Sequence, residues 1–142
     1  MYLEGILSIA GKPGLYKMVN QARNSLIVES LENKKRFPAF ATAKISALED
    51  IAIYTDTEEK PLVEVFNTIF ELEEGKSTIS HKVSNDELEK FMERVLPDYD
   101  KDRVRFADMK KLIQWYNTLV EKDILNEEAI ETYEKELAEQ EA

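Results

Sequence analysis

Short apolar runs alternate with polar turns in the first third of the chain, which is a pattern typical of β-strands. Runs rich in Leu, Ile, Val and Tyr at residues 15–20 and 25–30 are separated by a four-residue polar turn and predict a β-hairpin. A second polar turn leads into a third run, residues 36–41, in which Pro38 indicates an edge strand or a bulge. The pattern therefore predicts a three-stranded meander.

One helical turn and a closing strand are expected after this meander. Ser46 and Glu49 stand at capping-box spacing, and an apolar run at 51–54 follows them. Three meandering strands, one turn and a closing strand predict a small SH3-like β-barrel. Because apolar side chains lie on both faces of these strands, we expect helices from the rest of the chain to cover the second face.

The first ten residues fit a short helix, with a strand as the alternative. Leu3, Ile6, Leu7 and Ala10 repeat at helical spacing. Gly11, closely followed by a proline, suits a helix stop. We therefore expect the chain to open with a helical turn or two before the meander begins.

Apolar side chains at helical spacing, bounded by caps and stops, predict four helices after residue 57. The expected helices are 61–74 between Pro61 and Gly75, a second one between a Ser84–Glu87 capping box and Pro97, the strongest over 108–122, and an acidic one over 127–142 capped by Asn126. The sequence thus predicts an α+β fold. Its expected parts are an SH3-like β-rich domain over 1–57 and a C-terminal helical bundle over 58–142, packed against the barrel and ending in an acidic tail.

Charge is distributed unevenly between these two parts. The chain of 142 residues has a net charge of −10, and residues 1–57 contribute seven basic against six acidic side chains. An anionic surface disfavours binding to nucleic acid or to an anionic membrane. The chain has no cysteine, no apolar run near the ~20 residues that span a bilayer and no basic, apolar leader, so we expect a cytoplasmic protein.

Residues that could carry chemistry do not assemble into a known catalytic or metal motif. The GKPG at 11–14 lacks the glycine spacing and the Ser or Thr of a phosphate loop, and His81 is the only histidine. PDYDKD at 97–102 starts like a calcium loop, but Arg103 stands where that loop needs Gly and Met109 where it needs Glu. We therefore expect no enzyme, no cofactor and no metal site.

One basic cluster departs from the acidic background. Lys34, Lys35 and Arg36 lie at the second turn and are followed by Phe37 and Phe40. Residues three apart on a strand point to opposite faces, so one ring is expected to be exposed. A basic tip with an outward aromatic could stack a base or hold an acidic peptide. The alternative is a charged edge that resists aggregation, with both rings buried.

Several blocks of the sequence resemble a family of proteins of unknown function common in Bacteroidota. The similarity rests on GKPGLYKMV, SLIVESL, KRFPAFA, KISALEDIAIYT and DMKKLIQWYN, which recur in this family in the same order. The resemblance covers nearly the whole chain and implies a cytoplasmic protein with a β-rich N-terminal domain and a helical C-terminal part. Ala107 stands where the family pattern has Ser, which affects a helix cap. The resemblance implies no activity or cofactor.

Two functions follow as hypotheses. The first is a non-enzymatic binding or adaptor protein that holds a protein partner through the barrel or the helical surface. The second is a nucleic-acid-binding module that uses Lys34, Lys35, Arg36 and an exposed aromatic. Composition favours a protein partner, because counterion release from nucleic acid requires several well-placed cations and the chain offers one short cluster.

Overall fold

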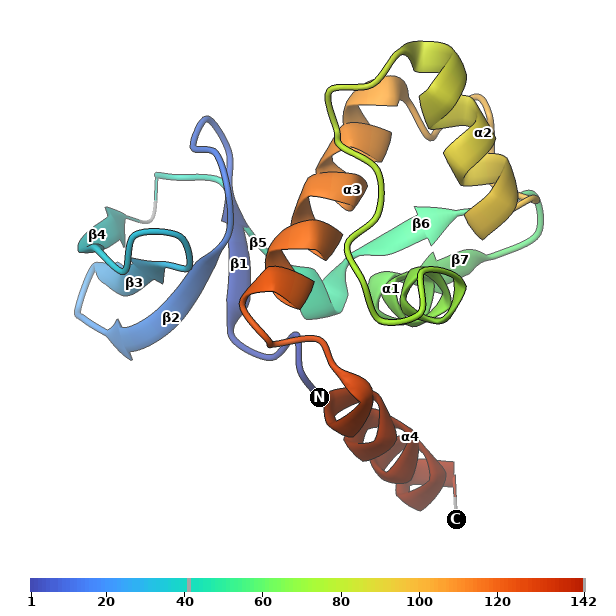
Figure 1. Cartoon of the computed structure of the whole chain (residues 1–142). Helices are drawn as coiled ribbons and strands as arrows, with labels where there is room; N and C mark the ends of the chain where they lie inside the picture. Colours follow the sequence, from blue (N-terminus) through green and yellow to red (C-terminus); the bar gives the residue numbers. More distant parts are fainter. Residues whose placement is uncertain (41, 142) are drawn as a thin grey trace. The chain divides into compact units, whose positions relative to one another are not determined.

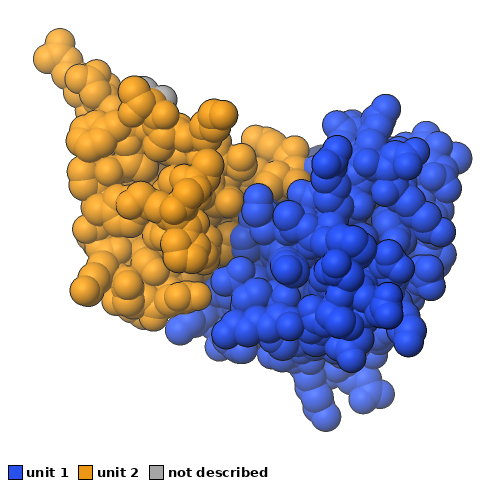
Figure 2. Space-filling view, turned by 90° about the horizontal axis from the view of Figure 1, so that it is seen from above, with its two compact units in different colours: residues 1–2, 52–142 blue, residues 3–51 orange. Residues whose placement is uncertain are grey.

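The chain forms two compact units, which Figure 2 distinguishes by colour. The structure is a computed structural model and describes residues 1–40 and 42–141. Ala41, the last residue of the third expected strand, and Ala142, the last residue of the acidic tail, lie outside the described residues. The sheet unit consists of Leu3–Ile51, and the helical unit consists of Met1–Tyr2 with Ala52–Ala142.

The sheet unit is an antiparallel sheet of five described strands in the order β4-β3-β2-β1-β5 (Figure 1). The two polar turns of the sequence connect β2 to β3 and β3 to β4, so the predicted meander is confirmed. Among the described residues no ladder joins β4 to β5, and the sheet is open rather than closed into a barrel. The strands are β1 Ile6–Ile9, β2 Tyr16–Gln21, β3 Ser25–Ser30, β4 Arg36–Phe40 and β5 Ile45–Ala47.

The expected N-terminal helix is wrong, since residues 6–9 form strand β1. Leu7 and Ile9 alternate into the sheet core, as the period of a strand requires. Leu3 and Ile6 are also buried, so the strand is apolar on both sides at its start. Burial on both faces placed apolar residues at i, i+3 and i+4, a spacing that a helix shares.

The strand that returns to the first one is β5, and the expected closing strand at 51–54 belongs elsewhere. The predicted helical turn is present as a 3₁₀ helix, Leu48–Asp50, but its N-cap is Ala47 and no side chain caps it. Ser46 instead lies within β5, paired with Ser8 of β1. Residues 52–54 form β6, Ala52–Tyr54, which pairs with β7, Glu59–Pro61, in the helical unit.

The helical unit contains the four predicted helices, with ends close to those expected. Ser84 Oγ accepts a hydrogen bond from the Glu87 amide at 3.3 Å, and Asn126 Oδ1 accepts one from the Ala129 amide at 2.8 Å. Both predicted N-caps are therefore confirmed, with the Ser84 hydrogen bond of the expected capping box present. Pro61 is the N-cap rather than the first helical residue. The helices are α1 Leu62–Leu72, α2 Asn85–Val95, α3 Phe106–Glu121 and α4 Glu127–Glu141.

Helix α3 is central to the core of the helical unit. Its side chains Leu112, Tyr116 and Leu119 are at most 2% exposed, and the Tyr116 ring lies 6.4 Å from the ring of Phe66 on α1. Helix α4 contributes far less, because Ile130 is its one buried residue within the described range. In Figure 1, α4 runs out from the other helices of its unit. Much of α4 is therefore exposed surface.

Candidate functional site

The outer face of the sheet carries exposed apolar side chains. Val28 pairs with Phe37 across β3 and β4, and this pair faces the core of the sheet unit. Because side chains alternate along a strand, Ile27, Pro38 and Phe40 point to the opposite, outer face. Phe40 is 55% exposed. The expectation that the two Phe rings point to opposite faces, with one exposed, is confirmed.

A bulge in β2 adds one more apolar residue to this face. The register of β2 against β3 shifts between Met18 and Asn20, which leaves Val19 as the extra residue of the strand. Val19 is 38% exposed and adjoins the row in which Asn20 pairs with Ile27. We call Val19, Ile27, Pro38 and Phe40 the outer apolar patch.

A groove adjoins Phe40 at the end of the sheet where β2 turns into β3. Its volume is about 350 Å³, and the turn residues 21–24 form one wall. The groove has an apolar lining from Leu26, Ala39 and Ile45, and one basic side chain, Arg23, in the wall formed by the turn. The sequence interpretation missed this combination, because Arg23 is 17 positions before Phe40 and the β3–β4 pairing brings them together. We call this groove with its Phe40 and Arg23 the aromatic groove.

The basic tip lies at the other end of β4. Lys34 and Lys35 are exposed, and neither forms an ion pair with a carboxylate in the part of the chain that the structure describes. Arg36 Nε lies 3.0 Å from Glu29 Oε1 on the neighbouring strand. Asn33 Oδ1 accepts a 2.9 Å hydrogen bond from the Lys35 amide, which orders the turn. Among the described residues, the tip thus offers two cations without a carboxylate partner.

The five residues singled out from the sequence do not form one site. Phe37 is half-buried, with its ring edge-on to Tyr16 at 5.5 Å and Lys12 Nζ 4.5 Å from its centroid. Phe40 is four residues beyond Arg36, which corresponds to about 13 Å along an extended strand. The structure therefore separates the basic tip from the exposed aromatic, and it places that aromatic and Arg23 along one groove instead.

The free edge of β4 is poorly suited to pairing with another strand. Pro38 has no backbone N–H, and it pairs with Ile27 while β4 has no strand on its other side among the described residues. Arg36 places a charge on the same short strand. Proline and charge on an edge strand both discourage strand addition. The outer face, rather than the edge, is the surface of β4 available to a partner.

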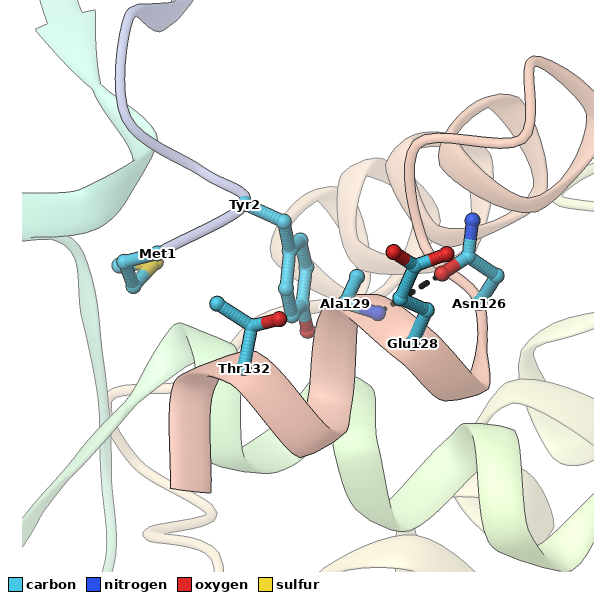
Figure 3. A pocket seen from close by; sticks show the side chains of 6 residues that line it. All are labelled: Met1, Tyr2, Asn126, Glu128, Ala129 and Thr132. Atoms are coloured by element: carbon cyan, nitrogen blue, oxygen red, sulfur yellow. Dashed lines mark hydrogen bonds between the residues drawn. The ribbon is translucent and has the colours of Figure 1, made fainter. Parts of the chain in front are cut away.

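A second hollow lies where the N-terminal residues meet α4. The Tyr2 side chain stands beside Ala129 and Thr132 of α4 (Figure 3). Its hydroxyl donates a 2.7 Å hydrogen bond to Asn67 Oδ1 on α1. Burial raises the pKa of Tyr2 far above its ordinary value, and the nearby Tyr133 adds to the rise. These contacts tie α1 to α4 through Tyr2, which is a structural role.

The acidic turn at 98–102 uses its carboxylates to cap backbone groups. Asp100 Oδ1 accepts hydrogen bonds from the amides of Asp102 and Arg103, at 2.9 and 3.2 Å. Over residues 1–40 and 42–141, no group of three or more His, Asp or Glu side chains is arranged to hold a metal ion. None of the helices in that range is long and apolar enough to cross a membrane.

The sheet and the helices define a two-unit α+β protein, and comparisons with known proteins give its family. Residues 3–48 match the family described as Domain of unknown function (DUF5606), and residues 51–119 match the Domain of unknown function (DUF6852). The chain belongs to the family of Bacteroidota proteins of unknown function that its sequence resembles, β-rich at the N-terminus and helical at the C-terminus.

A solved structure supports this membership. The chain is 52% identical to a protein from Bacteroides vulgatus, a structural genomics target with a solution NMR structure. The match covers 87% of this chain and 89% of that one, with a TM-score of 0.73. Comparison with curated proteins gave no match.

Proposed function

We propose that this protein is a non-enzymatic binding module that holds a segment of a partner protein at the aromatic groove. The observation that carries the proposal is Phe40, 55% exposed beside a groove that has Arg23 in its wall and apolar side chains in its lining. The matching segment has an apolar side chain to fill the groove and an acidic side chain to pair with Arg23.

The energetics of such contacts favour an anchor of this kind. Burying a large apolar side chain contributes about 1.5–3 kcal/mol, and aromatic and Arg residues dominate the binding energy of protein interfaces. The sheet unit has seven basic and five acidic side chains, a net charge of +2, in an otherwise acidic chain. An acidic partner segment is therefore attracted to the sheet unit rather than to the helical unit.

The composition of the groove also supports binding rather than catalysis. Its described lining has one cation, small polar side chains and apolar ones, with neither a histidine nor a carboxylate. General acid–base chemistry relies on such groups at the site of reaction. The groove lining is thus consistent with an adaptor.

A nucleic-acid reader is the second candidate, and Lys34 and Lys35 are the observation in its favour. Both are exposed without an internal partner among the described residues. Binding a single strand usually combines cations with aromatic rings on which bases stack. The nearest ring, Phe37, is half-buried under Lys12, and Phe40 lies about 13 Å along the strand from Arg36. Support for this function is therefore weaker.

The SH3-like assignment of the sheet unit is also part of the proposal. Its support is the path of the chain, in which β1 to β4 form a meander and β5 returns to the free side of β1. The bulge in β2 bends that strand and increases its local twist, as a strand that curls into a barrel requires. In solution we expect nuclear Overhauser contacts between β4 and β5. Rapid amide exchange along both edges without such contacts would contradict an SH3-like barrel.

Affinity capture followed by direct binding tests the adaptor function. The intact protein and its Phe40→Ser and Arg23→Glu variants are used as baits in native lysate, with and without nuclease, and captured proteins are identified and purified. We expect a protein partner that survives nuclease and binds each variant at least about tenfold more weakly in calorimetry. Leu72→Ser is the matched control, since Leu72 is 44% exposed on the helical unit and should leave affinity unchanged.

Two outcomes would overturn the adaptor proposal. One is a captured partner that binds Phe40→Ser and the intact protein equally well. The other is capture that nuclease abolishes, which would move the second candidate to first place. Melting curves of the variants serve as the folding control, because exposed positions should change the melting temperature little.

A further inference from the structure

We propose that a groove between α1 and α4 of the helical unit binds a basic amphipathic helix of a partner protein. This site is separate from the aromatic groove, and it does not depend on the function proposed above. The groove has a volume of about 590 Å³. Phe70 of α1 and Ile130 of α4, each 9% exposed, provide its apolar part.

The walls of this groove are strongly acidic. Five of its eight lining residues are Glu, and the other three are Phe70, Ile130 and Gly75. Over residues 1–40 and 42–141 none of these five carboxylates forms an ion pair with Lys or Arg. The five are Glu71 and Glu74 from the end of α1, and Glu127, Glu131 and Glu134 from α4. We call this the acidic groove.

The position of the acidic side chains on α1 is unfavourable without a cationic partner. The C-terminal end of a helix carries a partial negative charge, so basic residues are preferred there. The last turn of α1 has no basic residue, and Glu71 and Glu74 lie at this end. The neighbouring Glu73 is compensated by Arg94 at 2.6 Å, whereas these two are not. A cation supplied by a partner would relieve this repulsion.

The shape of the site indicates an extended ligand rather than a metal ion. The carboxylates are distributed along two helices, and the described residues contain no cluster of three or more ligands around one point. Hard cations such as Ca²⁺ need six to eight oxygen ligands converging on one centre. Separate carboxylates on both sides of an apolar floor instead match several Lys or Arg side chains on one helix.

The apolar side of α4 continues beyond the groove. Ile130 is buried, Tyr133 is half-buried and Leu137, one heptad after Ile130, is 38% exposed. A helix whose apolar stripe is only partly covered can accept a second helix along that stripe. The partner helix therefore carries apolar residues at i, i+3, i+4 and i+7, flanked by Lys or Arg. The helical unit's twelve basic and twenty-four acidic side chains favour such a partner.

Fluorescence anisotropy with a labelled synthetic helix of about 14 residues tests this site. The probe has Leu at i, i+3, i+4 and i+7 and Lys elsewhere. One control peptide has Glu in place of Lys, and another has the same composition shuffled so that no apolar face forms. We expect the probe to bind and both control peptides not to bind. Binding of the probe should weaken as salt is raised from about 50 to about 300 mM, because ion pairs are screened.

Two matched sets of charge-neutralising variants locate the binding. We expect the groove set to weaken probe binding by about tenfold or more and the control set to weaken it by less than about twofold. The groove set is Glu71→Gln, Glu74→Gln, Glu131→Gln and Glu134→Gln combined. The control set, whose residues are also exposed and lie on the same unit, is Glu58→Gln, Glu89→Gln, Glu93→Gln and Glu121→Gln combined.

Three results would overturn the proposal. Equal weakening by both sets would show that binding follows net charge alone. Equal binding of the shuffled peptide would remove the role of the apolar floor. A dimer of the intact protein that the groove set dissociates in sedimentation would assign the groove to a second copy of the chain.

Discussion

The hydroxyl of Tyr116 donates a 2.8 Å hydrogen bond to the carbonyl oxygen of Lys76, a residue 40 positions earlier in the chain. This contact attaches the loop after α1 to the middle of α3. Tyr116 itself is fully buried, and burial raises its pKa to about 12, with the negative charge of Glu73 adding to the rise. The loop and the core are thus joined through one titratable group.

Alkaline pH should therefore destabilise the protein through Tyr116. Its folded pKa of about 12 lies above the ordinary value of 10.0, so the stabilisation is fully present below pH 10 and is lost as pH rises through 12. Tyr116→Phe should reduce this loss, with the part due to Tyr2 remaining, and should cost about 1 kcal/mol near neutral pH, because the Lys76 carbonyl loses its donor. Urea unfolding at a series of pH values measures both effects. An unchanged alkaline slope in the variant would contradict the assignment.

Asn117 should be as important to the same loop as its neighbour. Its side-chain oxygen accepts the Thr78 amide at 2.8 Å, and its side-chain nitrogen donates to the Ile79 carbonyl at 3.0 Å. Asn117→Ala leaves both backbone groups without these partners, and we expect a loss of about 1–3 kcal/mol in the free energy of unfolding. Asn117→Asp can keep only the hydrogen bond that its side-chain oxygen accepts from Thr78, so its free energy of unfolding should lie between those of the intact protein and Asn117→Ala. Hydrogen exchange at Thr78 should accelerate in the Ala variant.

Gly75 should tolerate no side chain. It lies in the turn after α1 at φ +80°, its amide donates to the Phe70 carbonyl at 2.9 Å, and an added Cβ would stand 3.2 Å from Phe70 Cζ. Gly75→Ala therefore combines backbone strain with a tight contact and should destabilise by about 1–2 kcal/mol. Gly11→Ala is a useful comparison, because Gly11 has φ +81° but no atom within 4 Å of the added Cβ. Calorimetric melting should show the larger shift for Gly75→Ala.

Calcium should have no effect on stability. The carboxylate of Asp100 accepts two backbone amides, and Arg103 Nε lies 3.7 Å from it. Asp100→Ala should cost about 1 kcal/mol through the lost cap, with or without a chelator. A rise of several degrees in melting temperature at millimolar calcium, abolished by Asp100→Asn, would show that a metal site had been overlooked.

Short single-stranded DNA and RNA should bind no more tightly than ~100 μM at physiological salt, the weak end of non-specific association. The sheet unit offers one short cluster of cations, Lys34 to Arg36, and the chain's net charge of −10 repels a polyanion. Anisotropy titration measures the affinity. Micromolar binding that is lost when Lys34, Lys35 and Arg36 are all changed to Ala, with an unchanged melting curve, would favour the nucleic-acid reader.

Local chemistry made most of the architecture predictable. Polar turns gave the β2–β3 and β3–β4 hairpins, and side-chain caps at Ser84 and Asn126 gave the starts of α2 and α4. Burial on both faces made Ile6–Ile9 look helical, since strand alternation is invisible when neighbouring residues are all apolar. The closing strand was misplaced because β5 has three residues, too few for a pattern.

The candidate sites were less accessible to sequence reasoning for a physical reason. Phe40 and its exposed face followed from strand alternation, which is local. Arg23 reaches the same groove only through the register of three strands, and the acidic groove requires α1 and α4 to meet. Contacts between distant segments carry no short-range signature, so the sequence indicated the basic tip and missed both grooves.

Pro38 has a consequence for how the chain behaves when it is abundant. The strand that displays Phe40 has no backbone N–H donor at Pro38, so a second copy of the chain that pairs with this edge would form fewer hydrogen bonds. An exposed aromatic on a flat, unprotected edge would make fibre formation a hazard that grows with expression level. Pro38 thus lets this strand expose Phe40 on its outer face with a lower tendency to stack on a second copy of the strand.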